Sequence, residues 1–180
     1  GGCFAIRKSL YTPVPKNILV DDLFICLKIL EKGFLSINEL NSNVYEKISS
    51  DERGEFNRKI RIAAGSVQNL FYFAKLLNPF NAVGFCFFSH KVIRWFGPFI
   101  LLLILISNLI ILKSHPIYLT SFLVQIILIL FAILELFLKR KFHRSFVIGL
   151  GSYFYQSNIA ILIGWSKFIV GIKSSIWEPT

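Results

Sequence analysis

The sequence predicts a small α/β segment followed by an α-helical transmembrane bundle. Of the 180 residues, 54% are hydrophobic and 16% are aromatic, and the mean hydropathy is +0.62, unlike a typical soluble domain. The apolar excess lies after about residue 92, whereas acidic residues are concentrated before residue 56. The net charge of +10 comes from 20 Lys and Arg against 10 Asp and Glu. We therefore expect a water-facing part followed by a membrane part.

The start of the chain and its cysteines bear on its cellular context. The chain opens Gly1-Gly2-Cys3, has no methionine and lacks the basic and apolar stretches of a signal peptide. We therefore expect a fragment of a longer protein. Cys3, Cys26 and Cys86 are widely spaced and form no CxxC pair, so we expect reduced thiols and no zinc site.

The first 45 residues mix extended and helical patterns. The apolar run from Cys3 to Ile6 favours a strand, and Phe34 to Ile37 and Val44-Tyr45 are further extended candidates. Residues 21–33 instead place apolar side chains at helical spacing, with two acids in the first turn and a glycine at the C-cap position. These patterns predict a small mixed α/β element.

The two acids of that helix, Asp21 and Asp22, allow two interpretations. Acidic side chains in a first turn interact favourably with the helix dipole and need no catalytic role. A carboxylate can also accept a proton as a general base. Taken by themselves, the aspartates favour the structural interpretation.

A basic helix is predicted after Ser49, which forms a capping-box pattern with Glu52. Steps of three and four place six residues on one face: Arg58, Arg61, Gly65, Gln68, Tyr72 and Lys75. A basic amphipathic helix next to membrane spans most often lies in the lipid interface. The alternative is that Arg58 and Arg61 point the same way and bind a diphosphate.

Three apolar segments are candidate membrane helices. They are Trp95 to Leu112, Ile117 to Leu138 and, roughly, Phe146 to Val170. The third contains glycines and amides that suit a bundle interior or a re-entrant segment better than lipid. Basic residues before the first segment and between the second and third predict that these loops are cytoplasmic.

The order of these motifs resembles the second half of a membrane-bound family-2 glycosyltransferase, the group that includes cellulose, chitin and hyaluronan synthases. The resemblance covers nearly the whole chain, and its segments are Gly1 to Leu10, Val20-Asp21-Asp22, Arg58-Lys59-Ile60-Arg61-Ile62, Ser89 to Trp95 and Trp177 to Thr180. It implies that residues 1–54 are the C-terminal part of a GT-A-like catalytic domain. Residues 55–91 would form an amphipathic interfacial helix and connector, and residues 92–180 a region with about three transmembrane helices.

The resemblance also implies roles for four charged residues. Asp22 matches the family's general base, which deprotonates the acceptor hydroxyl, and Asp21 matches the acid before it. Arg58 and Arg61 match residues that contact the donor diphosphate. The expected activity is transfer of a sugar from a nucleotide-sugar donor to a saccharide or lipid acceptor, in polysaccharide or glycolipid synthesis.

Further expectations concern the acceptor, the metal and the location. Gly2 and Cys3 fall in the strand on the family's acceptor side, and Ile62 replaces the tryptophan that stacks on the acceptor sugar in that family. Mg²⁺ or Mn²⁺ is expected in the full-length protein through a motif absent from this chain. The fragment itself is expected to bind no metal and to be inactive alone. The expected location is a bacterial inner membrane with the catalytic segment in the cytoplasm. The protein is expected to contact membrane lipids and not nucleic acid.

A non-enzymatic integral membrane protein, serving as a scaffold or in transport, is the alternative. It explains the apolar segments and the positive charge. It does not explain why an acid pair and an Arg-x-x-Arg motif occur together before the membrane part, and this combination favours the transferase.

Overall fold

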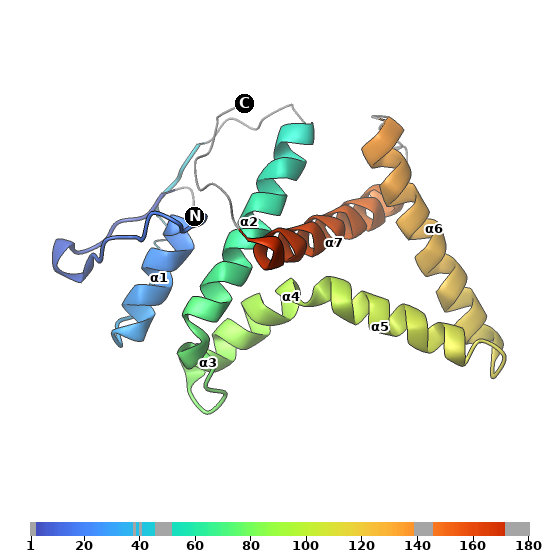
Figure 1. Ribbon diagram of the computed structural model, residues 1–180, viewed down its shortest axis with the longest axis horizontal. Coiled ribbons are helices and arrows are strands. Elements are labelled where there is room, and N and C mark those ends of the chain that lie inside the picture. Colours follow the sequence, from blue (N-terminus) through green and yellow to red (C-terminus); the bar gives the residue numbers. More distant parts are fainter. Residues whose placement is uncertain (1–2, 38, 40, 46–51, 139–145, 172–180) are drawn as a thin grey trace. The chain divides into compact units, whose positions relative to one another are not determined.

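The structure is a computed structural model that describes residues 3–37, 39, 41–45, 52–138 and 146–171. The chain divides into two compact units (Figure 1). Unit 1 comprises Gly1–Trp95 and Ile163–Thr180, and unit 2 comprises Phe96–Leu162. Helix α7, Phe146–Val170, contributes its first part to unit 2 and its last turns to unit 1.

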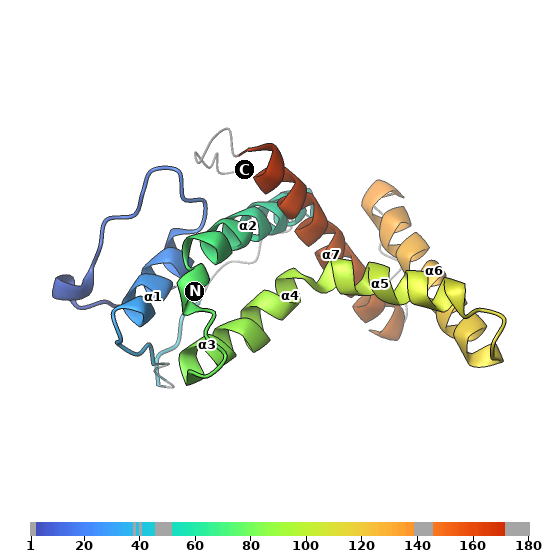
Figure 2. The same cartoon turned by 60° about the horizontal axis from the view of Figure 1, so that its bottom comes forward.

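Unit 1 is built from helices and short helical turns. In chain order these are η1 Lys8–Leu10, α1 Asp21–Glu31, α2 Glu52–Tyr72, η2 Ala74–Leu76, α3 Ala82–Phe87, the π-helical turn η3 Phe88–Val92, α4 Ile93–Trp95 and the end of α7. Helices α1 and α2 lie side by side (Figures 1 and 2). The aromatic rings of Phe24, Tyr72 and Phe73 fill the contact between them, with centroids about 5 Å apart.

Helix α1 ends where the sequence predicts. Gly33 has a φ of 82°, a left-handed conformation that glycine adopts without a steric penalty. Its N–H donates to the Leu30 carbonyl, and the Phe34 N–H donates to the Ile29 carbonyl. This pair of bonds is a Schellman motif, which satisfies the last carbonyls of the helix.

The predicted α/β segment is wrong for the residues that the structure describes, because they form helices and turns but no strand. Residues 3–6 and 34–37 were the longest strand candidates, and both are irregular and mostly exposed. A strand is stable only when its backbone groups pair with a neighbouring strand. The described residues provide no such neighbour, so short apolar runs alone do not produce a sheet.

The centre of α2 is the core of unit 1. Ala64 and Val67 are almost fully buried, as is Asn69. On one side Gly164 of α7 approaches so closely that a Cβ there would lie 2.6 Å from the Ala63 Cβ. The indole of Trp165 also donates a 2.9 Å hydrogen bond to the Trp95 carbonyl, which ties α7 to α4. The middle of α2 therefore contacts protein.

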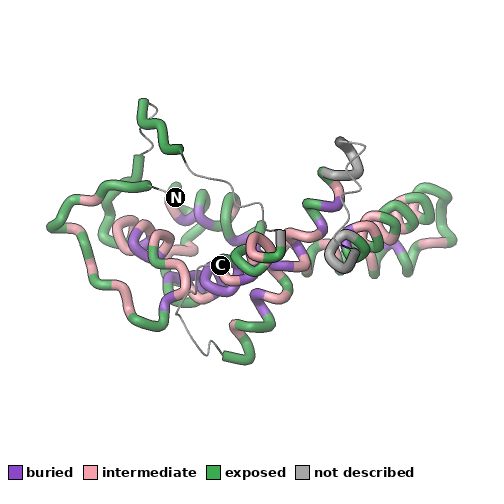
Figure 3. The backbone as a smooth tube through the Cα atoms, turned by 90° about the horizontal axis from the view of Figure 1, so that it is seen from above, coloured by how far each residue is buried: buried purple, intermediate pink, exposed green. Residues whose placement is uncertain are grey.

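Unit 2 contains α5, Gly97–Ile110, α6, Pro116–Leu138, and the first part of α7. Helices α5 and α6 expose large apolar side chains along their described length, and the unit buries polar side chains, among them Asn108, Ser152 and Asn158. The side-chain amide of Asn108 donates a 3.0 Å bond to Ser121 Oγ across α5 and α6. Residues 116–134 of α6 are exposed or half-buried except Ala132. Figure 3 colours the described backbone by burial.

One described helix is long and apolar enough to cross a membrane: α6, over Pro116–Leu134. Ala82–Trp95 and Gly97–Ile110 add a second candidate if the two segments are counted as one span. By length and composition the described helices thus supply one candidate span, which overlaps the predicted segment Ile117 to Leu138, and a second only if the pair, which is bent by 62° at its break, is one span.

Candidate functional site

The acid pair begins α1, as predicted from the sequence. Val20 is the N-cap residue and contributes no side-chain cap. The aspartates instead bind the first free amides themselves: Asp21 Oδ1 accepts from the Asp22 N–H at 3.0 Å, and Asp22 Oδ1 accepts from the Leu23 N–H at 2.7 Å. Helix N-termini leave such N–H groups without intrahelical partners, and a carboxylate satisfies them well.

Asp22 is half-buried, and Asp21 is exposed. Burial acts to raise the pKa of Asp22, but positive charge and hydrogen bonds at the carboxylate, the bond from the Leu23 N–H among them, lower the pKa below its ordinary value. The carboxylate is therefore ionised at neutral pH. This is the state that a general base requires.

The segment that leads into α1 is held by three side chains of α2, which we call the backbone clamp: Arg61, Gln68 and Asn69. An Arg61 Nη donates to the Leu19 carbonyl at 2.9 Å. The amide of Gln68 accepts from the Leu19 N–H at 3.1 Å and donates to the Asn17 carbonyl at 2.8 Å. The polar face of α2 thus binds main-chain groups two to four residues before the acid pair.

Asn69 completes the clamp from a buried position. Its Nδ2 donates to the Val20 carbonyl at 3.2 Å and to the Gly65 carbonyl at 2.9 Å. The same Val20 carbonyl accepts from the Phe24 N–H and so forms the first bond of α1. Asn69 therefore binds the group at which the acid helix starts.

The two arginines of the predicted diphosphate clamp have different partners. Arg58 forms two bonds to the Glu55 carboxylate, at 2.8 and 3.0 Å, and both side chains are largely solvent-accessible. The Arg58 guanidinium lowers the pKa of Glu55. Arg61 instead reaches the segment before Asp21. The structure brings Arg61 to the acid segment and pairs Arg58 within its own helix.

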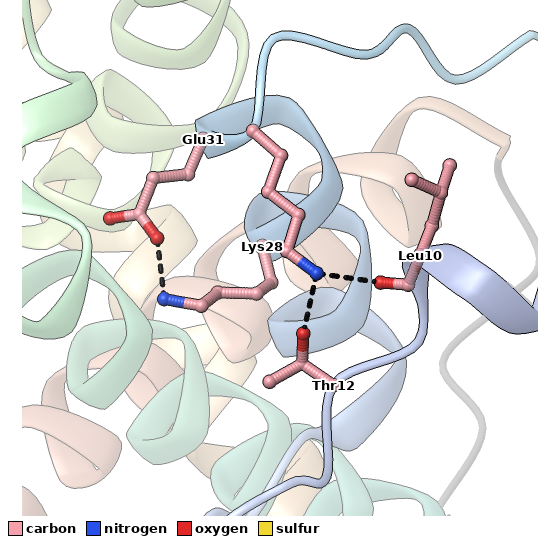
Figure 4. A network of polar contacts seen from close by, with 5 residues as sticks. Leu10, Thr12, Lys28 and Glu31 are labelled. Atoms are coloured by element: carbon pink, nitrogen blue, oxygen red, sulfur yellow. Dashed lines mark hydrogen bonds and ion pairs between the residues drawn. The ribbon is translucent and has the colours of Figure 1, made fainter.

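The far end of α1 is anchored as well. Lys32 Nζ donates to the Leu10 carbonyl at 3.0 Å and to Thr12 Oγ1 at 2.8 Å, the two bonds that meet in Figure 4. Beside them, Lys28 and Glu31 form an exposed ion pair, and its hydrogen bond raises the pKa of Lys28. Both ends of the acid helix are thus fixed to other segments of unit 1.

The remaining candidates are less informative. Gly2 and the capping residue Ser49 lie outside the described residues, and Cys3 is exposed. No group of three or more His, Cys, Asp or Glu side chains that could hold a metal occurs in the described part of the chain.

Sequence reasoning did not assign a role to Gln68 or Asn69. Gln68 was placed on the polar face of α2, but only the arginines of that face were given a partner. The signal for Asn69 is an amide within an apolar helical run, because a buried amide needs a hydrogen-bond partner. A main-chain segment that packs against the helix is one such partner.

Comparison with known proteins adds no relative. Neither the models of known families nor the curated proteins nor the solved structures include a match to this chain. The functional assignment therefore depends on the residues and their geometry.

Proposed function

We propose that this chain is part of a membrane-bound glycosyltransferase of the family-2 type, with Asp22 as its general base. The observation that supports this most is the joint placement of the two motifs. Arg61 of the Arg-x-x-Arg helix binds the Leu19 carbonyl, three residues before Asp22. The acid pair and the Arg-x-x-Arg motif are at least 36 residues apart in the sequence, yet they belong to one structural unit. A site that combines a general base with an anion-binding helix requires such an arrangement.

The proposed reaction uses the groups as follows. The Asp22 carboxylate takes the proton of an acceptor hydroxyl, and the resulting oxygen forms a bond to the anomeric carbon of the donor sugar. The bond between that carbon and the diphosphate breaks, and its electron pair leaves with the nucleoside diphosphate. Arg58 and Arg61 stabilise the charge that develops on the leaving group.

Arg58 can bind a diphosphate only if it first releases the Glu55 carboxylate. The Nε and one Nη of Arg58 bind Glu55. Phosphate oxygens must replace that carboxylate to use the same N–H groups, and the exchange is accessible because the pair is exposed. Glu55 would then hold Arg58 until a donor binds.

The divalent metal that the resemblance implies would neutralise donor phosphates when bound. The described residues contain no cluster suited to hold it. We therefore assign no step of this chain's chemistry to a metal.

The proposed location is a membrane with unit 1 on the cytoplasmic face. Exposed apolar side chains cover α5 and α6 in the described residues, and lipid is the solvent that such surfaces require. Basic residues that flank the spans favour the cytoplasmic orientation. The proposed partners are membrane lipids, a nucleotide-sugar donor and a saccharide or lipid acceptor.

A scaffold or transport role is the second candidate, and one observation favours it. Gln68 and Asn69 form four hydrogen bonds, and all four are to main-chain groups. This is expected of side chains that only stabilise a fold. Such a protein would tolerate the loss of the Asp22 charge.

Sugar transfer by membranes that carry the full-length protein distinguishes the two candidates. We expect Asp22→Asn to reduce transfer from radiolabelled nucleotide sugars by about 10²- to 10⁴-fold, the usual contribution of a general base. Glu31→Gln, an exposed acid at the other end of α1, is the matched control and should retain activity. Equal activity of wild type and Asp22→Asn would reject Asp22 as the base, and no transfer with any donor would favour the scaffold.

A further inference from the structure

We infer that Gln68 and Asn69 are positioning residues for the Asp22 carboxylate, an inference that rests on the proposed function. Neither side chain bonds to Asp22 in the contacts described above. Both act on the main chain that precedes it. Their role would be to fix the place and direction in which α1 begins, and thereby the place of the base.

The geometry of Gln68 supports this role. Its amide forms two bonds of opposite polarity to the backbone of Asn17 and Leu19. A main-chain segment that is held by one donor and one acceptor cannot slide by a residue without losing both bonds. Gln68 therefore fixes the register of residues 17–20 on α2.

Close packing makes this register unique. A Cβ on Gly65 would lie 2.5 Å from Val20 Cγ2 and 2.9 Å from Leu19 Cβ, so these side chains rest directly on the backbone of α2. Asn69 then binds the Val20 carbonyl, two residues before Asp22. From this point the helical backbone determines where the Asp22 carboxylate lies.

Asn69 offers a way to separate positioning from stability. Its Oδ1 is buried and has no hydrogen-bond partner among the described residues. Replacement by leucine, which has the same number of side-chain heavy atoms, removes the bonds to Val20 and Gly65 but also removes this buried acceptor, and these effects on stability oppose each other. We expect Asn69→Leu to yield near-normal amounts of folded protein and a displaced Asp22.

The first test measures sugar transfer per folded enzyme in membranes that carry the full-length protein. We expect Gln68→Ala and Asn69→Leu to lower kcat by about 10- to 100-fold, the effect of misplacing a reacting group by about 1 Å, with little change in the donor KM. The control is Asn57→Ala, an exposed amide on the same helix, which should behave as wild type. A normal kcat per folded enzyme in both clamp variants would overturn the inference.

A double-mutant cycle then tests whether Gln68 acts through Asp22. In an Asp22→Asn background there is no base to position, so Gln68→Ala should not reduce the residual rate further. Multiplying losses would show that Gln68 acts independently of Asp22 and would overturn the inference. Full activity of Asp22→Asn alone would instead reject the proposed function, so the two failures are distinguishable.

Discussion

Unit 1 and unit 2 differ in the side chains that they expose. Unit 1 places Phe24, Val67 and Phe73 in its interior and carries its charged residues outside. Unit 2 buries Asn108 and Ser152 and exposes leucine and isoleucine along α5 and α6. This difference agrees with the proposed membrane location, because apolar surface is excluded by water but not by lipid tails.

The largest effect should come from emptying the core of unit 1. Phe24→Ala removes a fully buried ring that contacts Tyr72 and Phe73, and we expect unfolding free energy to fall by about 3–5 kcal/mol. Phe80→Ala is the control, because that ring is 98% exposed. Chemical denaturation of the detergent-solubilised full-length protein measures both. An equal loss of unfolding free energy in both variants would mean that the exposed side chains of unit 1 do not face water.

A charge on the outer surface of unit 2 tests the solvent directly. Leu123 in α6 is 49% exposed, so Leu123→Arg would be harmless in water but should cost about 2.5–3.5 kcal/mol at the centre of a bilayer. Leu35→Arg, at a site of unit 1 that is 76% exposed, is the control. Alkaline extraction of membranes measures the inserted fraction. Normal insertion of Leu123→Arg would contradict the assignment of this surface to lipid.

Two glycines of α7 compare packing in the two units. A Cβ at Gly164 would meet Ala63 Cβ at 2.6 Å and the Ala64 backbone nitrogen at 2.8 Å, and backbone cannot move aside easily. We expect Gly164→Ala to destabilise unit 1 by about 1–3 kcal/mol. A Cβ at Gly151 meets the end of the flexible Leu128 side chain, so Gly151→Ala should cost less. Thermal melting measures the stability of both variants. A larger loss for Gly151→Ala than for Gly164→Ala would refute the prediction.

The smallest effect concerns the polar interior of unit 2. Asn108→Ala removes the bond to Ser121, and polar contacts between membrane helices contribute on average about 0.6 kcal/mol. Ser107→Ala, the exposed neighbour, should have no effect. Thermal melting in detergent measures the difference. A loss of stability several times larger would indicate that the Asn108 side chain stabilises unit 2 through more than this one hydrogen bond.

The helices were predictable from the sequence, whereas the strands that it predicted do not form in the described residues. Periodicity predicted α1 and α2, and the position of Gly33 predicted the end of α1, because both signals are local. A strand depends on a partner elsewhere in the chain, which the apolar runs at 3–6 and 34–37 cannot reveal. The mixed α/β prediction failed for this reason.

The site was partly predictable. The sequence placed Asp21 and Asp22 at a helix start and the arginines on the polar face of the next helix. Which arginine reaches the acid segment depends on how α1 and α2 pack, and this is a tertiary property. Nothing in the sequence indicates that Gln68 and Asn69 bind main chain, because an amide side chain can form hydrogen bonds with many kinds of group.

Gly65 shows why helix propensity alone would mislead an engineer of this protein. It lies in the interior of α2, where glycine is less favourable than alanine by about 0.5–1 kcal/mol. Gly65→Ala should therefore strengthen α2 as an isolated helix. In the folded chain it would push Leu19 and Val20 away from the helix and with them the start of α1. The less helical residue is the one that lets the acid segment dock.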